Sequence, residues 1–130
     1  MFGTGKIISS AQIVDKRDLT ARALQAASAL DSLGIGEGDA IAAFMRNDFP
    51  LFEAQGAASL LGAYFVTINW HFRSAEAKYI LSDSEAKALI VHADLLAEIH
   101  DLIPPGVAVL VVPTPGDIAQ AYGIDAASCE

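Results

Sequence analysis

The sequence predicts an α/β fold in which a mostly parallel sheet is flanked by helices. Short apolar runs rich in Val, Ile and Phe alternate with segments whose apolar residues recur every three or four positions. The apolar runs are continuous, which is typical of parallel strands covered on both faces. With 53% hydrophobic residues among 130, the chain can bury one core of domain size. We expect one α/β subdomain at residues 1–112 and a connecting segment at 113–130.

The first elements are predicted to be an antiparallel hairpin and a long helix. The hairpin occupies residues 6–14 and turns at Ser10-Ala11. Asp15, with Asp18 three residues later, is a variant of the capping box that begins many helices. The helix that follows carries apolar residues on one face: Leu19, Ala23, Ala26, Ala27, Leu30 and Leu33.

The next unit is a strand followed by a helix of small residues. Gly34 is expected to end the first helix in the left-handed conformation, and Ile35 to cover its last turn. A buried strand at 40–45 follows, and Asn47-Asp48 offers a cap for a helix at 52–61. Gly56, Ala57 and Ala58 give this helix little side-chain bulk, so it can lie close to the sheet.

The remaining elements repeat this order: a strand at 64–68, a helix at 75–83, a strand at 88–92, a helix at 95–102 and a strand at 107–112. Ser74 and Asp94 are predicted to cap the two helices, because Ser and Asp accept bonds from free amides at helix starts. Strands separated by helices of these lengths imply right-handed crossovers and a parallel sheet. The connecting segment is expected to form one short helical turn near 118–122.

The charge of the chain disfavours two classes of partner, and its cysteine content indicates a reducing compartment. The net charge is −8, and residues 85–130 carry seven acids against Lys87 alone. Such a surface disfavours binding to nucleic acid and anionic membranes. Cys129 is the only cysteine, so no internal disulfide can form. The start of the chain has no apolar run of secretory length, and we expect a cytoplasmic protein.

A membrane span is not expected, although one apolar run approaches the length of one. Ala54 to Phe72 is a run of nineteen residues without Asp, Glu, Lys or Arg. Gly62 interrupts this run, and its second half is β-branched and aromatic. A buried helix followed by a buried strand explains this pattern.

Three stretches carry a family resemblance. LGIGEGDAIAAFMRN at 33–47 has a helix ending in Leu-Gly, a turn with Gly-Asp, and a strand closing on Asn. LLGAYFVTIN at 60–69 repeats a helix end in Gly-Ala and a strand closing on Asn, and AEAKYILSDSEAK at 75–87 ends in an Asp-Ser-x-Ala-Lys turn. In this order they resemble the N-terminal segment of the AMP-forming acyl-CoA synthetases, which are adenylate-forming, AMP-binding ligases. The chain departs from the family's usual Arg, Pro and Pro at Ala40, Thr67 and Trp70.

The resemblance implies a carboxylic or fatty acid–CoA ligase of fatty acid metabolism, which makes an acyl-adenylate with release of pyrophosphate and then a thioester. It implies ATP, Mg²⁺ and coenzyme A as cofactors of the complete enzyme. The family's phosphate-binding loop, its adenine contacts and its catalytic lysine have no counterpart before Glu130. We expect the absent remainder of the synthetase to carry them. These residues alone would then be inactive and act as scaffold, with a wall of the acyl site as a further role.

No catalytic, cofactor-binding or metal-binding residue is predicted within the chain. Gly3-Thr4-Gly5-Lys6 lacks the Walker spacing, and Gly34 to Gly38 follows a helix and precedes a strand, the reverse of the dinucleotide-binding order. His92 and His100 lack a metal-ligand pattern, and a strand end and a helix surface explain them.

The best candidates for substrate binding are His71 and Trp70. They follow Asn69 at the end of a strand, where open α/β sheets place ligand-contacting loops. The competing interpretation is architectural: Asn69 bonds the turning backbone, Trp70 packs on the sheet and His71 is half exposed.

Two alternatives from other classes stay open. One is a free-standing flavodoxin-like binding module, which would share the strand–helix alternation. The other is a non-catalytic interaction domain or truncated product. We expect self-association, because a subdomain separated from its neighbours leaves apolar surface uncovered.

Overall fold

The computed structural model describes residues 4–9 and 12–130, and it confirms the predicted fold class. Four parallel strands form one sheet in the order β4-β3-β5-β6. The strands are β3 (Ala40–Phe44), β4 (Tyr64–Ile68), β5 (Ala88–His92) and β6 (Ala108–Val112). The helices are α1 (Lys16–Ser32), α2 (Phe49–Leu61), α3 (Ser74–Asp83), α4 (Ala93–Ile99) and α5 (Gly116–Tyr122), with 3₁₀ turns at His100–Leu102 and Ala126–Ser128.

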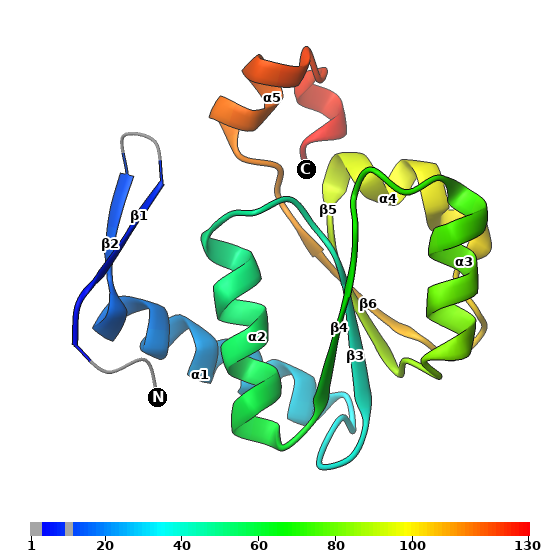
Figure 1. Ribbon diagram of the computed structural model, residues 1–130, viewed down its shortest axis with the longest axis horizontal. Coiled ribbons are helices and arrows are strands. Elements are labelled where there is room, and N and C mark those ends of the chain that lie inside the picture. The colour runs from blue at the N-terminus through cyan, green and yellow to red at the C-terminus, as the bar shows by residue number, and fades with distance from the viewer. Residues whose placement is uncertain (1–3, 10–11) are drawn as a thin grey trace.

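Helices cover both faces of the sheet, as Figure 1 shows. One core cluster joins α1 and α2 to the sheet through Leu30, Ala57 and Ile41. The other joins α3 and α4 through Leu81, Leu95 and Phe44. β3 and β5 lie in the centre of the sheet and are almost wholly buried, which explains their continuous apolar sequence.

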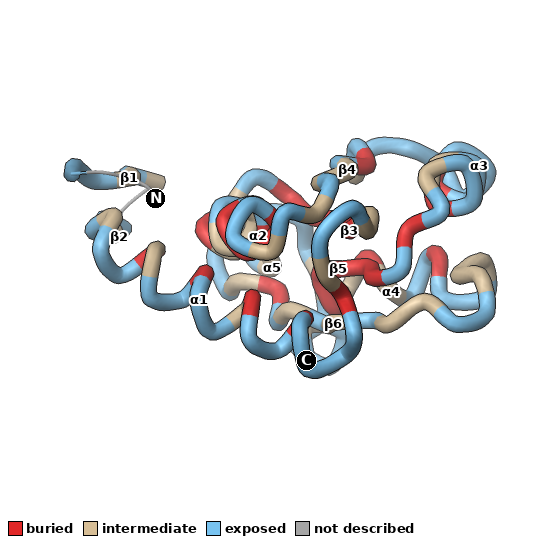
Figure 2. Tube along the Cα trace, turned by 90° about the horizontal axis from the view of Figure 1, so that it is seen from below, coloured by how far each residue is buried: buried red, intermediate tan, exposed pale blue. Residues whose placement is uncertain are grey.

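The hairpin of β1 (Lys6–Ser9) and β2 (Gln12–Asp15) is antiparallel, as predicted, and stands away from the sheet (Figure 2). The predicted turn residues Ser10 and Ala11 lie outside the described residues. Asp15 caps α1, and its carboxylate accepts a bond from the Arg17 amide at 2.7 Å. The expected face of α1 is buried at Leu19, Ala23, Ala27 and Leu30.

At the C-terminus of α1, the predicted Gly34 turn is confirmed and the predicted burial of Leu33 is wrong. Gly34 has φ of 81°, its amide donates to Asp31, and the Ile35 amide donates to Leu30. This is a Schellman motif, with Ile35 only 4% exposed over the last turn. Leu33 was predicted on the inner face but is 54% exposed, because it lies at the C-cap where the chain already leaves the helix.

Two predicted caps are wrong. Ser74 lies inside α3, whose N-cap is Arg73; the Glu76 carboxylate accepts from the Arg73 amide at 2.6 Å. α4 likewise begins at Ala93 with His92 as its N-cap, so Asp94 lies in the first turn. In both places the side chain that could cap the helix is bonded elsewhere. The Ser74 hydroxyl donates to the Glu98 carbonyl, and the Asp94 carboxylate accepts from Arg46.

One helix boundary and the burial of one strand also differ. α2 begins at Phe49, three residues earlier than expected, directly after the Asp48 cap. β4 was expected to be buried but is an edge strand, and Tyr64 on it is 69% exposed because, among the described strands, only β3 lies beside it.

Every helix in the described part of the chain is too short or too polar to span a bilayer. The run from Ala54 to Phe72 is divided between α2, β4 and the turn after it.

Candidate functional site at the carboxyl edge of the sheet

The carboxyl ends of the four strands meet at one edge of the sheet, which is the usual ligand-binding edge of open α/β folds. β3 leads into Met45-Arg46-Asn47-Asp48, β4 into the turn 69–72, β5 into α4 and β6 into Pro113-Thr114. α5 lies over the same edge (Figure 1). The groups discussed below all come from these segments.

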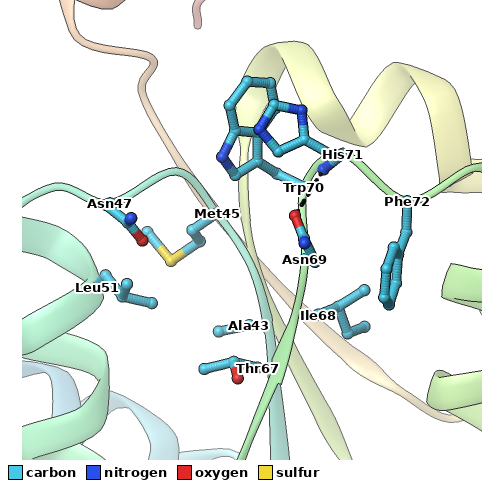
Figure 3. Close-up of a pocket in the computed structure, with 10 residues that line it drawn as sticks. All are labelled: Ala43, Met45, Asn47, Leu51, Thr67, Ile68, Asn69, Trp70, His71 and Phe72. Atoms are coloured by element: carbon cyan, nitrogen blue, oxygen red, sulfur yellow. Dashed lines mark hydrogen bonds between the residues drawn. The ribbon is translucent and has the colours of Figure 1, made fainter.

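A cleft of about 490 Å³ opens at the ends of β3 and β4. Figure 3 shows its walls. The apolar lining consists of Ala43, Met45, Leu51, Ile68 and Phe72, and the polar or aromatic lining of Asn47, Thr67, Asn69, Trp70 and His71. A lining that mixes apolar side chains with polar and aromatic ones suits a small molecule that has an apolar body and a polar end.

The turn 69–72 is held by its own hydrogen bonds, as predicted for Asn69. Asn69 Oδ1 accepts from the His71 amide at 3.0 Å, and the Asn69 carbonyl accepts from the Phe72 amide at 2.8 Å. Trp70 is partly buried, and its ring lies 3.6 Å from the His71 ring, centroid to centroid, at 32°. His71 is exposed. The structure therefore brings the two predicted residues together on one wall of the cleft.

A buried ion pair lies beside this turn. Arg46 contacts Asp94 with both terminal nitrogens: Nη1 lies 2.9 Å from Oδ1 and Nη2 lies 2.7 Å from Oδ2. The two side chains are 9% and 8% exposed. The Thr114 hydroxyl donates to Asp94 Oδ1 and accepts from the Asp94 amide. Burial alone would raise the pKa of Asp94, but the bonds from Arg46 and Thr114 hold it below its usual value.

Arg46 also contacts two aromatic rings. Its guanidinium carbon lies 4.9 Å from the Trp70 ring centre and 5.1 Å from that of Tyr122 in α5. Both distances are within the range of cation–π attraction. The rings of Trp70 and Tyr122 meet edge to face at 5.4 Å. One arginine thus joins β3, α4, the 69–72 turn and α5.

His92 is fully buried beneath this group. Its Nδ1 accepts from the Arg46 amide at 3.1 Å, so the neutral ring carries its proton on Nε2. Nε2 lies 3.9 Å from Asp48 Oδ2, and among the described residues it has no hydrogen-bond partner. Burial lowers the pKa of His92, and the nearby Asp48 carboxylate offsets this only in part.

Sequence reasoning missed Arg46, Thr114 and Tyr122 and misplaced Asp94 as a cap. The only local signal was a lone arginine directly after a buried apolar strand, where an unpaired charge would be costly. His92 was correctly placed at a strand end, but its contact with Arg46 joins residues 46 positions apart in the sequence.

The turn at Gly36 to Gly38 does not fit a phosphate group of ATP. Gly36 and Gly38 lie before β3, at the amino edge of the sheet, and their amides are already used: Gly36 donates to Asp39 Oδ2 and Gly38 to the Gly62 carbonyl. The Lys87 ammonium, 2.6 Å from Asp39, and the Gly36 amide lower the pKa of Asp39. In the other candidate loop, Gly5 accepts from the Lys16 amide, and Gly3 lies outside the described residues.

These features define an α/β domain with a ligand-sized cleft at the carboxyl edge of a parallel sheet. A family model described as AMP-binding enzyme matches residues 7–126. The chain therefore belongs to the AMP-binding enzyme family, as the three sequence stretches indicated.

Individual relatives agree with this assignment. The chain is 33% identical over 114 residues to 4-coumarate–CoA ligase CCL1 of Humulus lupulus, covering 86% of this chain and 20% of that protein. It is 37% identical over 93 residues to the long-chain-fatty-acid–CoA ligase FadD13 of Mycobacterium tuberculosis, covering 68% and 18%.

A solved structure is similar as well. The benzoate CoA ligase of Burkholderia xenovorans superposes with a TM-score of 0.77 at 26% identity, covering 85% of this chain and 23% of that one. The chain thus spans about a fifth of the length of these relatives.

Proposed function

We propose that these residues form the opening subdomain of an acid–thiol ligase. The complete enzyme would join a fatty or other carboxylic acid to AMP with release of pyrophosphate, and then transfer the acyl group to coenzyme A. The remainder of the synthetase would complete the active site. Within that enzyme the 130 residues act as scaffold, and the turn 69–72 forms one wall of the acyl cleft.

The family and its members support the reaction class. The relatives named above are ligases of coenzyme A with 4-coumarate, a long-chain fatty acid or benzoate, by their names. These acids differ in shape but share a carboxylate at the end of an apolar body. The cleft beside Trp70 has the same mixed character, because apolar residues such as Met45, Leu51 and Phe72 line it together with polar ones such as Asn47 and His71.

The internal pairing of the charged groups carries the scaffold assignment. Arg46 and Asp94 are buried and bonded to each other, so neither is free to bind a substrate carboxylate or to transfer a proton. His92 is buried with its Nδ1 occupied by a backbone amide. The groups at this edge therefore supply shape and rigidity.

ATP, Mg²⁺ and coenzyme A serve the complete enzyme, and no step through them is assigned to residues described here. A cytoplasmic location is part of the proposal, because the single cysteine of these 130 residues needs no oxidising compartment. The family assignment leaves the flavodoxin-like alternative without support. The non-catalytic alternative is an outcome of the experiment below.

The test uses the complete ligase that contains this segment. Pyrophosphate exchange that depends on a carboxylic acid, together with thioester formation, is measured for the wild type and for His71→Ala. The matched control is His100→Ala, whose ring is 62% exposed and lies away from the cleft. We expect His71→Ala to keep kcat within about threefold of the wild type, which is less than about 1 kcal/mol in the barrier.

Two results would count against the proposal. A hundredfold loss of kcat in His71→Ala at unchanged stability would make the turn part of the reacting site instead of its wall. No exchange with any carboxylic acid tested, in a folded full-length protein, would favour the non-catalytic alternative.

A further inference from the structure

Residues 113–130 fold back onto the carboxyl edge of the sheet. The Thr114 amide donates to the Cys129 carbonyl at 2.8 Å, which closes the segment into a loop around α5. Thr114 itself is only 6% exposed and is bonded to Asp94 in both directions. The segment is therefore anchored at one point by buried polar bonds.

Arg46 links this anchor to the cleft. Asp94 holds the guanidinium by two nitrogens, and the Arg46 amide is bonded to His92, so both ends of the residue are fixed. A guanidinium held in this way presents a flat, fixed face to neighbouring rings. Trp70 and Tyr122 occupy that position, and they also contact each other.

Trp70 connects these contacts to the wall of the cleft. Its ring contacts Arg46 and Tyr122, and it also stacks on His71, which lines the cleft together with Trp70. A small hollow of about 190 Å³ lies between Arg46, Asn47, Trp70, Ile118 and Tyr122, and it shares Asn47 and Trp70 with the lining of the larger cleft. Trp70 thus contacts Arg46, which is bonded to Asp94 in the anchor, and it also lines the cleft.

We propose that Arg46 and Tyr122 are positioning residues, through which the segment 113–130 sets the orientation of Trp70 and the shape of the cleft. In its relevance to substrate this proposal rests on the ligase function proposed above. Neither residue is assigned a contact with the substrate. Loss of the Tyr122 ring removes its edge-to-face contact with Trp70 and its contact with the Arg46 guanidinium, so Trp70 becomes more exposed and more mobile.

The test reads Trp70 directly, because it is the only tryptophan of the chain. Tryptophan emission and acrylamide quenching are measured for Tyr122→Leu, Tyr122→Phe and the control Tyr79→Leu in the 130-residue chain. Tyr122 and Tyr79 are 56% and 67% exposed, so both replacements remove a mostly exposed ring. We expect Tyr122→Leu to shift the emission to longer wavelength and to raise the quenching constant. Tyr122→Phe, which keeps the ring, and Tyr79→Leu should match the wild type.

Two outcomes would overturn the proposal: wild-type emission and quenching in Tyr122→Leu, or an equal change in Tyr122→Phe. If Tyr122→Leu unfolds, Arg46→Lys provides the same reading, since it keeps the charge but loses the planar face. Wild-type emission in a folded Arg46→Lys chain would equally refute the role of Arg46.

The complete ligase separates this proposal from the ligase assignment. There, Tyr122→Leu should raise KM for the carboxylic acid by about two- to fivefold and leave kcat nearly unchanged, because a displaced Trp70 alters the wall that binds the acid and no reacting group. A changed emission with unchanged KM would refute the link to the cleft. A changed emission in a protein without ligase activity would refute the proposed function but leave the positioning of Trp70 intact.

Discussion

Replacing Asp94 with Asn should strongly destabilise the chain. The substitution keeps the shape of the side chain but removes the charge that faces Arg46, whose side chain is only 9% exposed. Breaking a buried pair on one side costs about 3–5 kcal/mol, because the remaining charge stays buried and unpaired. A domain of this size is stable by about 5–15 kcal/mol in total, so the loss is a large share.

The assay is equilibrium unfolding in urea, followed by circular dichroism. With a denaturant slope of about 2 kcal/mol per molar, a loss of about 4 kcal/mol lowers the midpoint by about 2 M. The control is Glu53→Gln, which breaks the Arg22–Glu53 pair at 3.1 Å; because Arg22 is 54% exposed, we expect a loss below about 1 kcal/mol. The double variant Arg46→Met/Asp94→Leu, which removes both charges, should be more stable than Asp94→Asn alone.

A loss for Asp94→Asn no greater than that for Glu53→Gln would contradict this expectation, because it would mean that the Arg46 guanidinium reaches water when Asp94 no longer holds it. A double variant less stable than Asp94→Asn would contradict it as well.

Three further predictions concern other parts of the chain. First, the pKa of His92 is below its ordinary value of 6.5 in the folded state. As pH falls, His92 therefore binds its proton in the unfolded chain first. The free energy of unfolding should decrease below about pH 6.5 and stay flat above it, which urea titrations of the wild type can measure. A folded His92→Asn chain with the same pH dependence would refute the role of His92. Second, Gly62 has φ of 69°, and an added Cβ would lie 3.3 Å from Glu37 Cγ, so Gly62→Ala should cost about 1–2 kcal/mol. Gly36→Ala, which meets no described atom within 4 Å, should change stability by less than about 1 kcal/mol, and equal melting losses in the two variants would contradict this explanation. Third, Ile8 and Ile13 are cross-strand partners that are 69% and 60% exposed, so we expect the chain to self-associate. Light scattering in reductant should show this association, and Cys129→Ser should not change it. A monomer that binds no hydrophobic dye would contradict this prediction.

Most of the fold could be predicted because it is encoded locally. Gly34 followed by an apolar Ile35 indicates a Schellman motif within a few residues, and the structure has one. The apolar runs of β3 and β5 predict strands because both faces of a central parallel strand are covered. The Asn69 turn depends on a side chain bonding an amide two residues later, which is again local.

The candidate site was harder to predict because its contacts join distant parts of the chain. Arg46 and Asp94 are 48 positions apart, and Asp94 and Thr114 are 20 apart. No local pattern distinguishes Asp94 as an ion-pair partner from Asp94 as a helix cap. The same competition explains Ser74, whose hydroxyl lies 3.4 Å from the Glu98 carbonyl across the helix pair and caps no helix. Trp70 and His71 could be named as candidates because a strand end is visible in sequence, whereas Tyr122 could not, since nothing local brings α5 over that edge.

The scaffold assignment is tested most directly by calorimetric titration of the 130-residue chain with Mg-ATP. We expect no stoichiometric binding at micromolar nucleotide, because the glycine amides at Gly36 and Gly38 are already bonded within the chain and lie at the opposite edge from the cleft. Stoichiometric micromolar binding that is lost on replacing a residue of this chain would overturn the scaffold assignment. Such a residue would place part of the nucleotide site within these 130 residues.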